Sequence, residues 1–189
     1  MRGIAYFALI AAMAAALDGC VALVAGSGTA VIVGDDRRKA GVYLDDEAIE
    51  LHGRNRMHEL FPQASVSVGI TSFNHQVLLT GQAPDESTKD SIEATIRDIP
   101  KVRKLYDEIT VSGIPSLGSE ADDSIITTEV KARLSNVKGV GFNQMKVVTE
   151  SGVVYLMGVV THEQADAAAQ VAATTRGVVR VVKVAEYTD

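Results

Sequence analysis

The segment Val77-Leu78-Leu79-Thr80-Gly81 decides the fold of this chain because it occurs twice. Its second copy is Val154-Tyr155-Leu156-Met157-Gly158, at an offset of 77 residues. The same offset, carried without a gap, pairs Asp45-Asp46 with Asp122-Asp123. A repeat at a fixed spacing marks one structural unit that is used more than once. The chain is therefore expected to contain two copies of one small domain.

Hydrophobic periodicity gives both copies the same order of elements. Apolar residues at i, i+4, i+8 and i+11 predict a first helix, and alternating residues predict the strands. Each copy is predicted to be helix–strand–strand–helix–strand, an α+β fold in which two helices cover one face of a three-stranded sheet. We expect a signal peptide, a lipidated N-terminus with its tether, a first domain, a linker and a second domain over residues 1–19, 20–43, 44–112, 113–121 and 122–189.

The inward face of each first helix and its start can be predicted in the same way. The acidic pairs Asp45-Asp46 and Asp122-Asp123 are interpreted as caps at the helix starts. Thr161 to Gln164 forms a capping box that opens the second helix of the second copy. The residues expected to face inward are Ile49, Gly53, Met57 and Leu60 in the first copy, and Ile126, Val130, Leu134 and Val137 in the second.

The net charge of −6 argues against nucleic acid as a partner, since a phosphate backbone favours clustered Lys and Arg. The charge is unevenly divided between the copies. Residues 44–112 hold 12 acidic and 7 basic side chains, whereas residues 122–189 hold 8 and 7. The second copy is therefore less opposed to an anionic surface.

The residues before the first copy are typical of an export signal. Ile4 to Leu17 is an uninterrupted apolar run, too short to span a bilayer comfortably. It ends in Leu17-Asp18-Gly19-Cys20, which resembles a bacterial lipobox. The resemblance implies cleavage before Cys20, the only cysteine, and acylation of that residue. Asp18 departs from the motif, and an uncleaved signal anchor or an ordinary secretory signal is the alternative.

The order of elements, with a glycine closing the second strand, resembles the BON domain. The resemblance rests on Val77 to Gln82, Ile126 to Thr128 and Val147 to Thr161, and covers nearly all of the chain after the signal. It implies a non-enzymatic, lipid-anchored protein of the outer membrane that faces the periplasm. It also implies that the second domain binds anionic phospholipid, phosphatidylglycerol or cardiolipin, and that the protein supports envelope integrity.

The resemblance points to the first helix of the second domain as the lipid-facing element. Helical residues are 100° apart, so Ile125 is rotated away from its inward neighbour Ile126 and is expected to be exposed. Family members can carry a large aromatic residue here, and this chain departs from them with Ile125. The alternative is that Ile125 packs against the first copy and the cations are a solvated face. The other candidate phospholipid contacts are Thr128, Lys131, Arg133 and Lys138.

The sequence contains no constellation that indicates catalysis or metal binding. The four histidines are scattered, and none pairs at i, i+4 as helical metal ligands do. Gly81 and Gly158 are expected to serve the backbone, at strand exits where a side chain would clash with the following helix. We expect no enzyme and no cofactor. The alternative function is a periplasmic protein–protein interaction module that recruits an envelope assembly factor.

Overall fold

The computed structural model describes residues 40–62, 66–112, 120–137, 140–141 and 144–189. The predicted order of elements is confirmed in both copies. The first domain consists of α2 (Ala40–Leu60), β1 (Ser67–Phe73), β2 (Gln76–Ala83), α3 (Glu86–Arg97) and β3 (Lys104–Val111). The second consists of α4 (Glu120–Leu134), β4 (Met145–Glu150), β5 (Val153–Val160), α5 (His162–Ala173) and β6 (Arg180–Tyr187).

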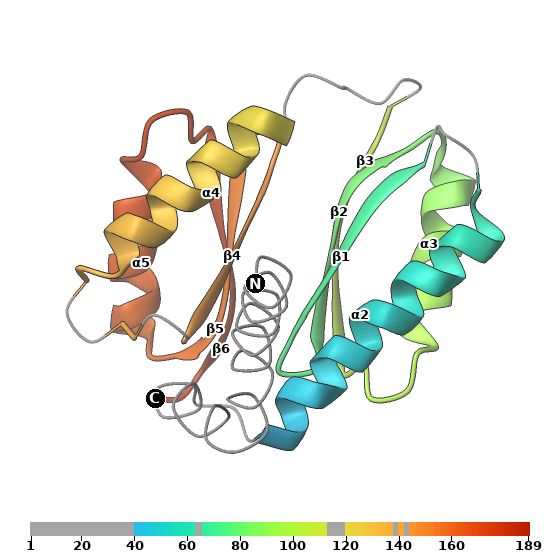
Figure 1. Cartoon of the computed structure of the whole chain (residues 1–189), viewed down its shortest axis with the longest axis horizontal. Coiled ribbons are helices and arrows are strands. Elements are labelled where there is room, and N and C mark those ends of the chain that lie inside the picture. Colours follow the sequence, from blue (N-terminus) through green and yellow to red (C-terminus); the bar gives the residue numbers. More distant parts are fainter. Residues whose placement is uncertain (1–39, 63–65, 113–119, 138–139, 142–143) are drawn as a thin grey trace, which may run out of the picture. The chain divides into compact units, whose positions relative to one another are not determined.

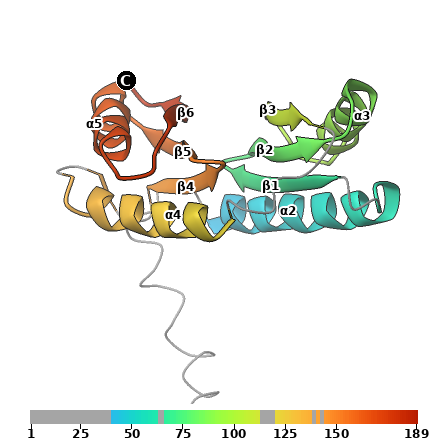
Figure 2. The same ribbon diagram turned by 90° about the horizontal axis from the view of Figure 1, so that it is seen from above.

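Each domain is a three-stranded sheet with two helices on one face, as Figure 1 and Figure 2 show. The strand order is β1-β2-β3 in one sheet and β4-β5-β6 in the other. In the first domain β2 pairs antiparallel with β1 and parallel with β3, and β5 does the same between β4 and β6. The repeated segment is thus the central strand of both sheets. The α+β class predicted from the sequence is confirmed.

The central strand is apolar because both of its faces are buried. Val77 and Leu79 pack under the helices of the first domain, while Leu78 points to the opposite face. Alternate residues of a strand point to opposite sides of the sheet, so a strand buried on both sides is a continuous apolar run. Val154 and Leu156 repeat the helix side in the second domain.

The faces of the two sheets that carry no helix contribute to one shared cluster. Phe73 and Leu78 come from the first sheet, and Tyr155, Met157 and Val184 come from the second. All three apolar clusters lie between residues 49 and 185. A chain that begins at residue 21 therefore retains all the described core residues of both domains.

The predicted capping is confirmed for α5 and is wrong for the two first helices. The Thr161 hydroxyl accepts a hydrogen bond from the Gln164 amide, and the Gln164 side chain accepts one from the Thr161 amide. This capping box is confirmed. α2 begins at Ala40 and α4 at Glu120, so Asp46 and Asp123 lie inside their helices and cap neither.

Asp46 is buried and holds the turn between β1 and β2. Its carboxylate accepts hydrogen bonds from the Ser72 hydroxyl at 2.7 Å and from the amides of Asn74 and His75 at 2.8 Å each. Both turn residues have positive φ angles, 54° for Asn74 and 62° for His75. Two-residue hairpin turns of this kind are strained for residues other than glycine. The buried carboxylate offsets that strain.

The second domain repeats this arrangement, and the neighbouring first-domain aspartate has another role. Asp123 accepts hydrogen bonds from the amides of Ser151 and Gly152, which form the turn between β4 and β5. Asp45 instead forms an ion pair with Lys101 at 2.6 Å. Its hydrogen bond with Lys101, followed by its hydrogen bond with His75, lowers the pKa of Asp45. Asp45, Asp46 and Asp123 therefore make tertiary contacts, whereas Asp122 is exposed.

The inward stripe of α2 ends one turn earlier than predicted. Ile49, Gly53 and Met57 are buried, whereas Leu60 is 57% exposed. Its neighbour Phe61 packs against the core in its place. Within the described part of the chain, no helix is long and apolar enough to cross a membrane.

Candidate functional site

α4 is held on its sheet by one apolar stripe. Ile126, Val130 and Leu134 are buried, each 6% exposed or less. The three residues share one helical face because they recur at a spacing of four. This anchoring fixes which residues of α4 point to solvent, and the candidate surface follows from it.

Ile125 lies outside that stripe, as predicted, and 65% of its surface is exposed. The alternative of packing against the first domain does not hold for a side chain this exposed. A single exposed apolar residue is ordinary on a protein surface. Ile125 is a candidate because it lies on the solvent-facing side of α4, which also carries the cation Lys131.

Thr128 and Lys131 follow Ile125 around the exposed side of α4. Three residues of helix turn the chain through 300°, so each step of three moves about 60° around the axis. Both side chains are exposed, and the Thr128 hydroxyl donates to the Ser124 carbonyl at 2.9 Å. No ion pair of Lys131 occurs among the described residues. Ile125, Thr128 and Lys131 together are called the α4 outer surface below.

Arg133 is not part of this surface. Its guanidinium donates to the hydroxyl of Thr175 at 2.7 Å and to that of Thr174 at 2.8 Å, at the end of α5. The repeat-related Arg56 likewise donates to the Thr95 carbonyl in α3 at 2.9 Å. An arginine that ties the first helix to the second in both copies is part of the scaffold.

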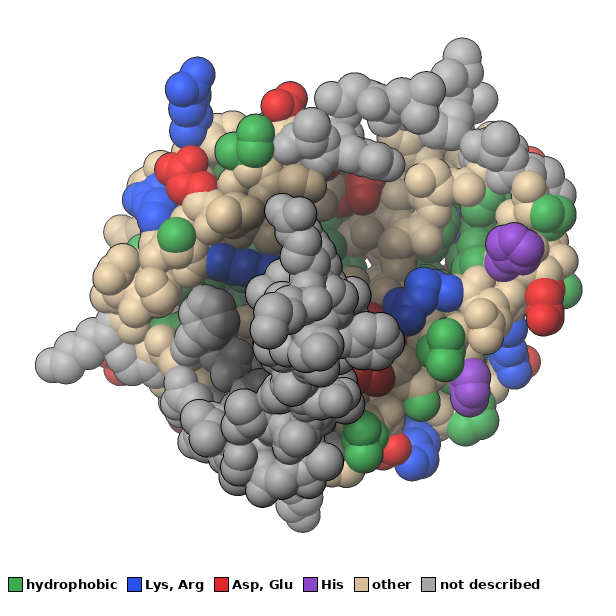
Figure 3. Space-filling view, in the orientation of Figure 1, with side chains coloured by type: hydrophobic (Ala, Val, Ile, Leu, Met, Phe, Trp, Pro, Cys, Tyr) green, Lys and Arg blue, Asp and Glu red, His purple; other side chains and the backbone are tan. Residues whose placement is uncertain are grey.

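The charges around α4 are of both signs. Asp122 and Glu129 are exposed on this helix as well as Lys131. Figure 3 shows acidic and basic side chains side by side on the α4 side of the molecule. The surface therefore offers an apolar side chain with one flanking cation rather than a broad basic patch. Lys138, the remaining predicted cation, and Cys20 lie outside the described residues.

The sequence reasoning missed exposed apolar residues on the first domain. Leu44 and Leu51 of α2 are 67% and 51% exposed. They are seven residues apart, which places them on one face of the helix. This face also shows histidines among apolar side chains in Figure 3. A helical wheel of the whole of α2 predicts this face, since it lies opposite the buried residues Ile49 and Gly53.

Gly81 and Gly158 are close to the neighbouring strand and not to the following helix. A Cβ on Gly81 would lie 2.0 Å from the Ser67 carbonyl oxygen, and its φ of 110° also disfavours a side chain. A Cβ on Gly158 would lie 2.8 Å from the Gln144 carbonyl oxygen. The predicted reason, a clash with the next helix, is wrong, and both glycines lie where a side chain meets backbone.

Comparison with known proteins gives the family. The BON domain matches residues 45–113 and 122–189. The outer membrane lipoprotein DolP of Haemophilus influenzae is 38% identical over 175 residues, which cover 92% of this chain and 91% of that protein. The 21 kDa hemolysin of Actinobacillus pleuropneumoniae is 37% identical over 153 residues, covering 80% and 79%.

Solved structures add little to this assignment. CdsD, a structural protein of the type III secretion system of Chlamydia trachomatis, covers 71% of this chain and 91% of its own with a TM-score of 0.30 and 13% identity.

The family matches and the DolP likeness span both copies of the repeat. The chain therefore belongs to the BON-domain family, and it is an outer-membrane lipoprotein with two BON domains that is similar to DolP.

Proposed function

We propose that the second BON domain docks on anionic phospholipid through the α4 outer surface while acyl chains at Cys20 anchor the protein. The protein faces the periplasm and supports envelope integrity without catalysing a reaction. The expected lipid partners are phosphatidylglycerol and cardiolipin. The proposal rests on the BON-domain family and on the exposure of Ile125.

One observation carries the proposal: Ile125 is 65% exposed on a helix whose opposite face packs in the core. When such a side chain inserts at the lipid interface, burial of its apolar surface stabilises the bound state by about 25 cal/mol for each Å². Lys131, 120° further around the helix, can stay among the headgroup phosphates. A cation near an anionic membrane contributes about 1 kcal/mol. Apolar insertion thus supplies most of the free energy, and charge supplies a modest preference.

A contact of this size is weak alone and becomes significant through the anchor. Acyl chains at Cys20 hold the second domain near the same membrane, so the second binding event is intramolecular. The effective concentration of surface is then set by the segment that joins the anchor to the first domain. Two-point attachment is therefore the proposed mechanism.

Liposome co-sedimentation tests the proposal on residues 21–189, which keep all core residues of both domains. We expect binding to vesicles that contain phosphatidylglycerol, and weaker binding to vesicles of phosphatidylcholine alone. Ile125→Asp removes the inserted group and adds a negative charge, so binding should fall at least about tenfold.

The matched control is Leu51→Asp, which makes the same change in charge at an exposed apolar position of α2. It should leave vesicle binding within about twofold of the unchanged chain. Equal and negligible sedimentation with both vesicles contradicts the proposal, as does an equal loss in the two variants.

A second candidate function is a protein–protein interaction module. Exposed Leu44 and Leu51 on α2 favour it, because apolar side chains that share a helical face form contacts with partner proteins. The cations of α2 are also already engaged, Arg54 with Glu50 and Arg56 with α3. Under this function Leu51→Asp removes co-purification of a partner and Ile125→Asp does not.

A further inference from the structure

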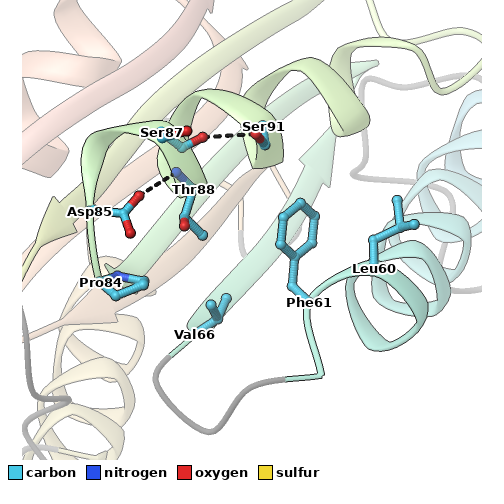
Figure 4. A pocket seen from close by; sticks show the side chains of 8 residues that line it. All are labelled: Leu60, Phe61, Val66, Pro84, Asp85, Ser87, Thr88 and Ser91. Carbon is cyan, nitrogen blue, oxygen red and sulfur yellow. Dashed lines mark hydrogen bonds between the residues drawn. The ribbon is translucent and has the colours of Figure 1, made fainter.

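An open pocket of about 390 Å³ lies at one end of the first domain. It is bounded by the end of α2, the residue that leads into β1, the link from β2 to α3, and the first turns of α3 (Figure 4). Pockets of a few hundred Å³ are of the size that holds a small ligand or a side chain of a partner. The α4 outer surface belongs to the other domain, so this pocket is independent of the proposed membrane contact.

One side of the pocket is apolar. Leu60, Phe61, Val66 and Pro84 line it, and in Figure 4 the Phe61 ring and Val66 point into the space. The pocket accounts for Leu60, which the helical pattern assigned to the core and which is 57% exposed. This wall can bury an aliphatic group.

The other side of the pocket is polar and acidic. The Asp85 carboxylate caps α3, accepting the Thr88 amide at 2.7 Å, and the Ser91 hydroxyl donates to the Ser87 carbonyl at 2.8 Å. The hydrogen bond from the Thr88 backbone lowers the pKa of Asp85, which keeps the carboxyl ionised. An ionised carboxylate has capacity for further donors. This wall therefore favours a hydrogen-bond donor or a cation.

Neighbouring charges reinforce this preference. Glu86 is exposed directly beside Asp85. The nearest lysine in the chain, Lys89, is turned toward β3, where its ammonium donates to the Ile109 carbonyl at 2.9 Å and lies 3.5 Å from Asp107. None of the eight described lining residues is basic. A phosphate or carboxylate would be repelled at this rim.

The second domain provides an internal comparison on the same scaffold. The link from the central strand to the second helix is one residue shorter there, so the N-cap Asp85 corresponds to the N-cap Thr161, and Thr88 and Ser91 correspond to Gln164 and Ala167. Gln164 and Ala167 are half-buried, as is Thr88, whereas Ser91 is exposed. The Asp85 carboxylate and the hydroxyls of Thr88 and Ser91 are therefore particular to the first domain.

We propose that this pocket binds a short peptide segment of a partner protein, in which an aliphatic side chain lies next to a lysine or arginine. The aliphatic group lies on the wall of Leu60, Phe61 and Val66. The cationic group passes the hydroxyls of α3 and reaches Asp85. The apolar stem of a lysine or arginine suits a pocket with one apolar and one polar side. A fatty acid or an anionic lipid would fill the apolar side but place its acidic headgroup against Asp85 and Glu86.

The test is an NMR titration of residues 21–189 with acetyl-Leu-Lys-Leu-Lys-amide. We expect saturable shifts of the Leu60, Phe61, Val66 and Thr88 amides. The charge-reversed acetyl-Leu-Glu-Leu-Glu-amide should bind about tenfold more weakly or not at all. Leu60→Ser should weaken binding of the lysine peptide about tenfold, while Leu51→Ser, at an equally exposed position of the same helix, leaves it unchanged.

A second pair of variants tests the charge. Ser87→Lys places a cation in the pocket at an exposed helical position and should abolish binding, whereas Asp90→Asn makes the same change in net charge elsewhere on α3 and should not. Amide spectra of the variants report whether each is folded. Three results overturn the proposal: no binding of the lysine peptide, equal binding of the glutamate peptide, or tighter binding of decanoate, which would assign the pocket to acyl chains.

Discussion

The buried aspartates show how one residue type can serve two roles that look alike in sequence. Asp46 and Asp123 precede apolar helical stripes, which is the pattern of a helix cap. Their actual partners are turn amides 28 or 29 residues further along the chain. A local pattern carries no information about so distant a partner. Only the repeat hinted at it, since both copies keep an aspartate at this position.

The first prediction concerns these aspartates. Asp46→Ala should lower the free energy of unfolding by about 3 kcal/mol, because it leaves two turn amides and a buried hydroxyl without their charged acceptor. Asp122→Ala, at an exposed position of α4, is the control and should change stability by less than about 0.5 kcal/mol. Urea denaturation measures both. Equal stability of the two variants contradicts the role assigned to the buried carboxylate.

The second prediction concerns the glycine of the repeated segment. Gly81→Ala should destabilise the first domain by about 3 kcal/mol or more, since the new Cβ meets the Ser67 carbonyl oxygen and the φ of 110° stays unfavourable. Gly41→Ala has nothing within 4 Å and should be neutral or slightly stabilising within α2. Thermal unfolding of the two variants decides. A stable Gly81→Ala protein would mean that β1 and β2 can separate at this point.

At the scale of the elements, periodicity predicted every helix and strand of both domains and missed their ends. It predicted the exposure of Ile125 correctly, because exposure follows from rotation about one helix axis. It misassigned Arg133 because the contact with Thr174 and Thr175 involves a second helix 41 and 42 residues away. It also placed Leu60 inside, since the stripe could not show that Phe61 takes over at the helix end.

The third prediction compares a buried position and an exposed position on the two second helices. Ala168→Leu should cost about 1–3 kcal/mol, because Ala168 is fully buried between α5 and its sheet and a larger side chain overpacks the space. Ser91→Leu, at an exposed position of α3 beside the pocket, should change stability by less than about 1 kcal/mol. The midpoints of denaturant unfolding, compared at equal slope, provide the measurement. An equal cost at both positions contradicts the contrast between a buried Ala168 and an exposed Ser91.

For the molecule as a whole, the shared cluster joins the two sheets and polar contacts surround it. Lys146 pairs with Glu50 at 2.6 Å, and Arg103 pairs with Glu186 at 3.1 Å. The Tyr155 hydroxyl donates to Glu108 at 3.3 Å. The sequence could not predict these contacts. The continuous apolar run of each central strand indicates burial on both faces, but it does not identify what covers the second face.

The fourth prediction is the pH dependence of this contact. Burial, followed by the nearby charge of Glu108, raises the pKa of Tyr155 from 10.0 to about 12. The folded state thus favours the neutral phenol, so its contribution to stability is complete below pH 10 and is lost as the pH rises toward 12. Tyr155→Phe should flatten the loss over this window. Tyrosinate absorbance against pH checks the pKa, and titration of all tyrosines near 10 contradicts it.

The central claim is that α4, and not α2, meets the membrane. The most direct measurement is paramagnetic broadening of side-chain methyl resonances by a lipid with a spin-labelled headgroup. The chain is anchored through Cys20 in a nanodisc that contains phosphatidylglycerol. We expect strong broadening of the Ile125 methyl groups and little broadening of those of Leu51. Broadening of Leu51 in preference to Ile125, or of neither, would contradict it.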